Sequence, residues 1–154
     1  MAAKKPHIMV VEARFYTEIS DALFEGAERA LKKGGATLER FPVPGALEIP
    51  GAIRLAIEAQ SQEKLKKPFD GFLALGCVIR GETTHYETVC NESARGLMEL
   101  GVRYAACVGN GILTVENDDQ AWARARMTEG DKGGGAADAV LAMIAIRKKL
   151  GLTA

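Results

Sequence analysis

The sequence predicts an α/β protein in which a parallel sheet is covered by helices on both faces. Short, continuous apolar runs alternate with helical patterns along the whole chain. Continuous apolar runs are typical of strands that are buried on both faces, and strict strand–helix alternation is typical of parallel sheets. The 154 residues are enough for one hydrophobic core, so residues 1–154 are expected to form a single domain.

Four segments are expected to be strands. Residues 8–11 form a wholly apolar run, whereas residues 37–43 are less apolar and are expected nearer an edge of the sheet. The third strand is expected at 72–75 and the fourth at 104–108. Residues 112–115 either extend the fourth strand or form the loop after it.

Five helices are expected where apolar side chains repeat at helical spacing, with Pro50 at the start of the second. Their approximate ranges are 17–34, 50–63, 85–101, 118–126 and 136–149. The glycine run 133–135 is expected to be a flexible hinge between the last two helices, because glycine restricts the backbone least.

Composition and charge disfavour several classes of protein. The net charge is zero, which argues against nucleic-acid binding, and no apolar run approaches the roughly 20 residues that span a membrane. Residues 1–6 lead directly into a strand and lack the apolar stretch of a signal peptide. Three cysteines without CxxC spacing indicate reduced thiols in the cytoplasm, and two histidines without clustered ligands make a metal site unexpected.

Residues 76–86 carry the strongest functional signal. They begin where the apolar run 72–75 ends and stop where a helical pattern starts, so a strand end, a turn and a helix start are expected. Such a turn directs backbone N–H groups and the positive end of the helix dipole at an anion. The segment adds a cation, two hydroxyls and an imidazole, which are Arg80, Thr83, Thr84 and His85. It therefore predicts phosphate binding and proton transfer.

Three further segments, 13–16, 43–50 and 109–111, follow predicted strands. Ligands of parallel α/β folds bind beyond the carboxyl ends of the strands, so these segments are candidate parts of the same site. Phe15 either stacks on a planar ligand or fills the core. Glu48 either accepts hydrogen bonds from ligand hydroxyls or stabilises the next helix through its dipole.

The charged and titratable candidates also have two interpretations each. His85 either faces solvent at a helix start or transfers protons, and its place beside a phosphate-type turn favours proton transfer. Arg124 lies late in its helix and suits the helix dipole, and its sequence context alone does not identify it as a ligand. Lys132 is equally ambiguous. The sequence contains neither GxGxxG nor GK[ST], which argues against a dinucleotide or nucleoside triphosphate enzyme.

Four blocks of the sequence together resemble the lumazine synthase family, in that family's order and spacing, and the resemblance covers nearly the whole chain. The blocks are residues 13–15 (Ala-Arg-Phe), 43–50 (Val-Pro-Gly-Ala-Leu-Glu-Ile-Pro), 76–85, and 111–114 (Gly-Ile-Leu-Thr) followed by Gln120, Ala121 and Arg124. The resemblance implies a three-layer α/β/α sandwich around a four-stranded, parallel, flavodoxin-like sheet.

The resemblance also implies a reaction. Members of the family condense 5-amino-6-(ribitylamino)pyrimidine-2,4-dione with 3,4-dihydroxy-2-butanone 4-phosphate. The product is 6,7-dimethyl-8-ribityllumazine, phosphate and water are released, and the step belongs to riboflavin biosynthesis. These transferases need no cofactor and no metal. Two alternatives remain open, a flavin- or lumazine-binding protein with low turnover and an assembly scaffold of the same fold.

Roles for matched residues follow from the same resemblance. Phe15 would stack on the pyrimidine ring. The ribityl chain would be held by the backbone of Ala46 and Leu47 and by the carboxylate of Glu48. The heterocycle would be contacted by the main chain of Cys77, Val78 and Ile79. Asn110 is also expected to bind substrate, although many members carry Phe there, and Tyr16 stands where many carry Asn.

The phosphate and proton-transfer roles fall on five residues. Glu82 and Thr83 would bind phosphate through backbone N–H groups and the threonine hydroxyl, and Arg124 would supply the cation. Lys132 is a further phosphate candidate, and His85 would transfer protons.

Family members form pentamers whose neighbouring subunits share each site. By that resemblance, Phe15, Glu48 and His85 would come from one chain, and Arg124 and Lys132 from the next. Some members assemble pentamers into an icosahedral shell. Many shell-forming members read Gly-Thr-Lys-Ala-Gly-Asn-Lys-Gly where this chain reads Arg-Met-Thr-Glu-Gly-Asp-Lys-Gly, so a free homopentamer is expected here.

Overall fold

Within the described part of the chain, the sheet is parallel and has four strands, as the sequence predicts. The computed structural model describes residues 4–152, so the outermost residues of the predicted domain, 1–3 and 153–154, lie outside it. The strands are β1 (His7–Ala13), β2 (Thr37–Val43), β3 (Gly71–Ile79) and β4 (Val108–Val115). They lie in the order β2-β1-β3-β4, which confirms that residues 37–43 form an edge strand.

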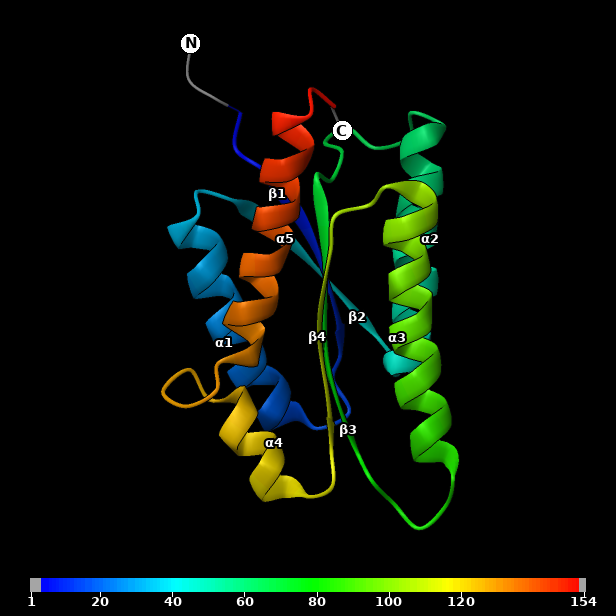
Figure 1. Cartoon of the computed structure of the whole chain (residues 1–154), viewed down its shortest axis with the longest axis vertical. Coiled ribbons are helices and arrows are strands. Elements are labelled where there is room, and N and C mark those ends of the chain that lie inside the picture. Colours follow the sequence, from blue (N-terminus) through cyan, green and yellow to red (C-terminus); the bar gives the residue numbers. More distant parts are fainter. Residues whose placement is uncertain (1–3, 153–154) are drawn as a thin grey trace.

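Helices cover both faces of this sheet and confirm the three-layer α/β/α sandwich (Figure 1). One layer contains α1 (Thr17–Lys33), α4 (Asp118–Ala125) and α5 (Lys132–Lys149). The other contains α2 (Ile49–Ser61) and α3 (His85–Tyr104). In residues 4–152 no helix combines the length and the apolar character that crossing a membrane requires.

The centre of the fold is β1, whose seven residues are all buried. Successive side chains of a strand point to opposite faces. Val11 accordingly packs with Ile53 of α2, and Val10 packs with Leu31 and Val140 of α1 and α5. All five are fully buried, and each such side chain contributes about 1.5–3 kcal/mol through the hydrophobic effect.

The fourth strand was predicted at the wrong place. Residues 104–108 do not form it, because α3 continues to Tyr104 and ends with Ala105 in the left-handed region at φ 53°. The N–H of Ala106 then donates to the carbonyl of Leu100, a helix-ending bond, at 3.3 Å. β4 begins only at Val108 and includes residues 112–115, so residues 109–111 lie inside the strand and not at its carboxyl end.

The third strand is also longer than predicted. β3 continues past residue 75 to Ile79, paired with β4 through Ile79 and Val115. The turn that precedes α3 is therefore confined to residues 80–84, which we call the β3–α3 loop.

The glycines at 133–135 are not a hinge, because they form the start of α5. A Cβ atom on Gly133 would lie 2.1 Å from the carbonyl oxygen of Leu23, so glycine here lets α5 approach α1 closely. Similarly, a Cβ atom on Gly109 would lie 2.3 Å from the carbonyl oxygen of Ala136, which brings α5 against β4. Close backbone approach, and not flexibility, explains Gly133 and Gly109.

A buried carboxylate lies near the carboxyl end of β1. Glu12 is 2% exposed and accepts two hydrogen bonds from Arg40 of β2, at 2.8 and 2.9 Å. It also accepts one from Arg14, at 3.0 Å. A bidentate guanidinium pair satisfies a buried carboxylate better than a single contact, so Glu12 joins β1 to the edge strand.

Replacing Glu12→Gln should lower the free energy of unfolding by about 1–3 kcal/mol, because the charge-assisted bonds are lost while the side chain stays buried. Urea unfolding followed by circular dichroism measures this. The matched control is Glu28→Gln, which removes an exposed helical pair with Lys32 (3.4 Å) and should change stability by less than about 0.5 kcal/mol. Equal effects of the two changes would contradict a special role for Glu12.

Candidate active site

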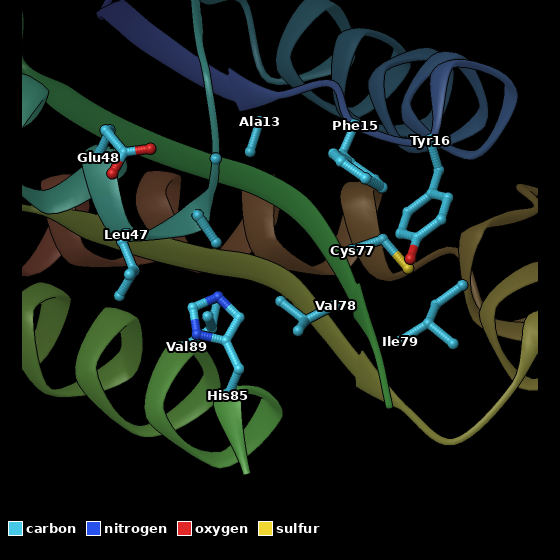
Figure 2. Close-up of a pocket in the computed structure, with 12 residues that line it drawn as sticks. Ala13, Phe15, Tyr16, Leu47, Glu48, Cys77, Val78, Ile79, His85 and Val89 are labelled. Carbon is cyan, nitrogen blue, oxygen red and sulfur yellow. The ribbon is translucent and has the colours of Figure 1, made fainter. Parts of the chain in front are cut away.

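Three chain segments that the sequence analysis singled out converge on one pocket at the carboxyl ends of β1 and β3 (Figure 2). We call it the strand-end pocket. Its volume is about 280 Å³, and its lining residues are Ala13, Phe15, Tyr16, Gly45, Ala46, Leu47, Glu48, Cys77, Val78, Ile79, His85 and Val89. The predicted ligand position beyond the strand ends thus coincides with a real cavity.

Phe15 does not fill the core. It directly follows β1 and is 76% exposed, so an aromatic face is available to a planar ligand. Tyr16 meets it edge to face, with ring centroids 4.9 Å apart and an interplanar angle of 76°. Tyr16 also lines the pocket, with its hydroxyl directed toward Cys77 (Figure 2).

The last residues of β3 form one wall of the pocket. They pair with β4 as far as Ile79, whereas the pairing of β3 with β1 ends at Leu75. Cys77 is 8% exposed, and its burial, assisted by the negative charge of Asp118, raises the pKa of its thiol to about 12. A thiol with that pKa remains protonated at neutral pH and is a poor nucleophile. Cys77 is therefore unsuited to nucleophilic catalysis and lines the pocket as part of its wall.

The segment before α2 forms the opposite wall. The 3-10 turn Ala46–Glu48 buries Ala46, while the Leu47 and Glu48 side chains are exposed. Among residues 4–152 the carboxylate of Glu48 makes no hydrogen bond or ion pair, although Gly45 lies beside it. It is therefore free to accept hydrogen bonds from ligand hydroxyls.

His85 is the first residue of α3 and directs its exposed imidazole into the pocket (Figure 2). The β3–α3 loop before it is exposed, and His85 donates its backbone N–H to the hydroxyl of Thr83 at 3.3 Å. Within residues 4–152, the backbone N–H groups of residues 81–84 have no protein acceptor. Free N–H groups at the start of a 20-residue helix favour an anion next to the imidazole.

The remaining predicted site residues lie elsewhere in the chain. Arg124 and Lys132 are exposed and line a second cavity of about 430 Å³ between β4 and α5, together with Asn110. We call it the β4–α5 cavity. Arg124 donates to the carbonyl of Gln120 on its own helix, at 3.0 Å. One chain thus carries the predicted residues as two separate sets.

Sequence reasoning gave no individual role to four lining residues of the strand-end pocket, which are Ala13, Tyr16, Gly45 and Val89. The first three lay in the candidate segments 13–16 and 43–50, and the position of Tyr16 directly after Phe15 was a usable signal for a role of its own. Val89 is a buried residue of α3, and only the packing places it at the pocket.

The raised pKa of Cys77 gives a pH prediction. Because only the thiolate reacts with iodoacetamide, alkylation of Cys77 should accelerate about tenfold per pH unit between pH 8 and 10. An ordinary exposed cysteine would instead level off near its pKa of about 8.5. Peptide mass spectrometry after timed alkylation resolves Cys77 from Cys90 and Cys107. A plateau for Cys77 below pH 9 would show that it is not held protonated by burial.

Comparison with known proteins agrees with this geometry. The model of the family described as 6,7-dimethyl-8-ribityllumazine synthase matches residues 5–148. The 6,7-dimethyl-8-ribityllumazine synthase 1 of Rhizobium meliloti is 57% identical over 152 residues, which cover 98% of each chain. The 6,7-dimethyl-8-ribityllumazine synthase of Agrobacterium fabrum is 56% identical over 147 residues, or 96% of this chain and 98% of the relative. The 6,7-dimethyl-8-ribityllumazine synthase of Bartonella tribocorum is 55% identical over 148 residues, which cover 96% of this chain and 94% of the relative.

The resemblance that four sequence blocks predicted is therefore confirmed over almost the whole chain. The fold, the strand-end pocket and these relatives agree, and the chain belongs to the 6,7-dimethyl-8-ribityllumazine synthase family.

Proposed function

We propose that the strand-end pocket is where this chain condenses 5-amino-6-(ribitylamino)pyrimidine-2,4-dione with 3,4-dihydroxy-2-butanone 4-phosphate. The observation that carries the proposal is the convergence of an exposed aromatic ring, an unpaired carboxylate and an imidazole on one cavity. A low-turnover binding protein or a scaffold would have no use for an imidazole beside a set of free N–H donors, so the enzymatic reading is favoured.

The pyrimidine substrate fits between Phe15 and the end of β3. Its ring stacks on Phe15, and its polar edge meets the main chain of Cys77, Val78 and Ile79. The ribityl hydroxyls then reach the 3-10 turn, where the backbone of Ala46 and Leu47 and the carboxylate of Glu48 hold them. This assignment is supported by the arrangement of aromatic, strand and carboxylate around one cavity.

The phosphate of the second substrate is assigned to the β3–α3 loop. Backbone N–H groups of Glu82 and Thr83, with the Thr83 hydroxyl, donate to its oxygens. In the reaction an amine attacks a ketone, a Schiff base forms, phosphate leaves and the ring closes. Each step moves protons, which His85 relays from its place beside the loop. Donors around the departing phosphate stabilise its charge, and alignment of the two substrates supplies much of the remaining acceleration.

A neighbouring copy of the chain is proposed to complete the site. Arg124 and Lys132 line a different cavity from His85, so they reach the phosphate only if they come from another subunit. An apolar groove beside β4, bordered by the exposed side chains of Met98, Val102 and Met143, supports self-association. Asn110 lines both this groove and the β4–α5 cavity, and so would also meet the substrate across a subunit boundary.

We favour a free homopentamer over a shell because of the changed linker at 126–133. Glu129 of this linker pairs with Arg126 within the same segment (3.1 Å), and the N–H of Gly134 is taken up by Asp131 (3.2 Å), which caps α5. Arg126, Glu129 and Asp131 of the linker thus make their polar contacts within the same chain. We place the reaction in the cytoplasm, because all three cysteines are free thiols and two of them are buried.

The direct test mixes both substrates with the protein and follows formation of fluorescent 6,7-dimethyl-8-ribityllumazine. Phe15→Ala should weaken product binding by on the order of 1–3 kcal/mol, on analogy with the stacking of bases on aromatic side chains. Phe15→Trp keeps a stacking face and should bind nearly as well as the parent. Failure of the parent to form lumazine would reject the function, and tight product binding by Phe15→Ala would reject the stacking role alone.

A shared site predicts complementation between two inactive chains. His85→Ala and Arg124→Ala proteins should each be nearly inactive, and a mixture that is unfolded and refolded together should regain activity. Some interfaces of mixed particles then combine an intact His85 side with an intact Arg124 side. Sedimentation should give roughly five chains per particle, as expected for a closed cyclic assembly. Verified mixing without recovered activity would contradict the shared site, whereas a shell-sized particle would contradict only the interpretation of the linker.

A further inference from the structure

Arg80 begins the β3–α3 loop. The sequence analysis counted it as the cation of a phosphate-type turn, but the proposed function gives it no role. Its backbone N–H donates to the carbonyl of Val115 at 2.9 Å, which extends the pairing of β3 with β4 by one residue. The start of the loop is therefore fixed to the sheet. The other hydrogen bonds of the loop lie at its far end, where the His85 N–H donates to the Thr83 hydroxyl at 3.3 Å and the Thr84 carbonyl accepts from the N–H groups of Glu87 and Thr88.

The side chain of Arg80 joins three structural elements. Its Nε donates to Oε2 of Glu116, the residue after β4, at 2.6 Å. Its Nη1 donates to Oε1 of Glu87 in the first turn of α3. The guanidinium carbon also lies 4.3 Å from the centre of the Tyr86 ring, a cation–π contact. The hydrogen bond from Arg80 is the largest cause of the lowered pKa of the Glu87 carboxyl.

These contacts connect the two ends of the β3–α3 loop to each other. Arg80 precedes residues 81–84, and Glu87 and Tyr86 follow them, so the guanidinium connects the two sides of the segment that carries the free N–H groups. Glu116 is itself held, because its N–H donates to Oε1 of Gln120 at 2.8 Å. The end of β4 thus serves as a fixed anchor for the contact.

We propose that Arg80 is a positioning residue that fixes the β3–α3 loop and His85 in the arrangement that binds the phosphorylated ketone. This inference rests on the proposed binding of phosphate by that loop. Arg80 acts through the loop and not on phosphate itself, because two carboxylates neutralise its charge and hold its Nε and Nη1. Exposed ion pairs generally add little to global stability, so the effect is expected in substrate binding and not in unfolding.

The test is steady-state kinetics of R80Q and R80K with each substrate varied in turn. Misplaced binding groups cost from about tenfold to a hundredfold in catalysis, so R80Q should raise the KM for the ketone phosphate by at least about tenfold. The KM for the pyrimidine should stay within about twofold, since its contacts lie on other segments. R80K keeps the charge but cannot hold two carboxylates in one planar fork, so it should be intermediate.

The chain offers a matched control in Arg95. This arginine also bridges two carboxylates, those of Glu92 (2.7 Å) and Glu99 (2.9 Å), but all three residues lie on α3. R95Q should therefore leave both KM values unchanged. If R95Q and R80Q have the same effect, loss of a surface ion pair explains the result and the positioning role is wrong.

The carboxylates separate positioning from direct phosphate contact. E87Q should raise the KM for the ketone phosphate, and R80Q/E87Q should be no worse than R80Q, because both changes break the same contact. If Arg80 touched phosphate directly, E87Q would free the guanidinium and lower that KM, which would overturn the proposal. Should R80Q fail to accumulate as folded protein, R80K with E87Q gives the same comparison.

Thr83→Ala distinguishes failure of this inference from failure of the proposed phosphate loop. If Thr83→Ala raises the KM for the ketone phosphate and R80Q does not, the loop binds phosphate and Arg80 does not position it. If neither change alters that KM, the loop assignment fails, and the role of Arg80 fails with it. An increase in both, with R95Q unchanged, supports the proposal.

Discussion

The parallel arrangement around β1 is the constraint on which the rest of the structure depends. A strand buried on both faces with a parallel neighbour on each side must end at the same edge of the sheet as those neighbours. Phe15, the 3-10 turn before α2 and the end of β3 therefore meet without any long loop. One of the covering helices, α3, starts beside this edge, and its first turn places His85 at the pocket.

The elements predicted correctly from the sequence are those whose pattern fits only one type of secondary structure. Residues 8–11 are uniformly apolar and became a strand buried on both faces. Residues 104–108 are apolar too, but a short apolar run fits a helix end as well as a strand, and the left-handed turn at Ala105 decided between them. The glycines at 133–135 were wrongly predicted to be a hinge, because glycine serves both flexible segments and close packing. At Gly133, only the neighbouring backbone of Leu23 distinguishes the two.

The site residues also fall into two groups, those that a local sequence pattern indicated and those that it did not. Phe15, Glu48 and His85 could be proposed from their positions after strands and before helices, and the structure places all three around one cavity. No local pattern identified Arg124 or Lys132, whose roles came only from the family resemblance. The structure of one chain leaves them in another cavity. A residue that acts on a neighbouring subunit leaves no periodic signal in its own sequence.

The charges around the strand-end pocket supply a physical reason for a shared site. None of the residues that line it is lysine or arginine, yet a departing phosphate needs positive charge nearby. Arg80 is the cation of the adjoining loop, and Glu87 and Glu116 already neutralise it. Within residues 4–152, this pocket therefore combines free N–H donors and an imidazole with no free cation. Arg124 and Lys132 are exposed in the β4–α5 cavity, where Arg124 bonds to the Gln120 carbonyl of its own helix. In the proposed shared site they would supply the positive charge that the pocket lacks.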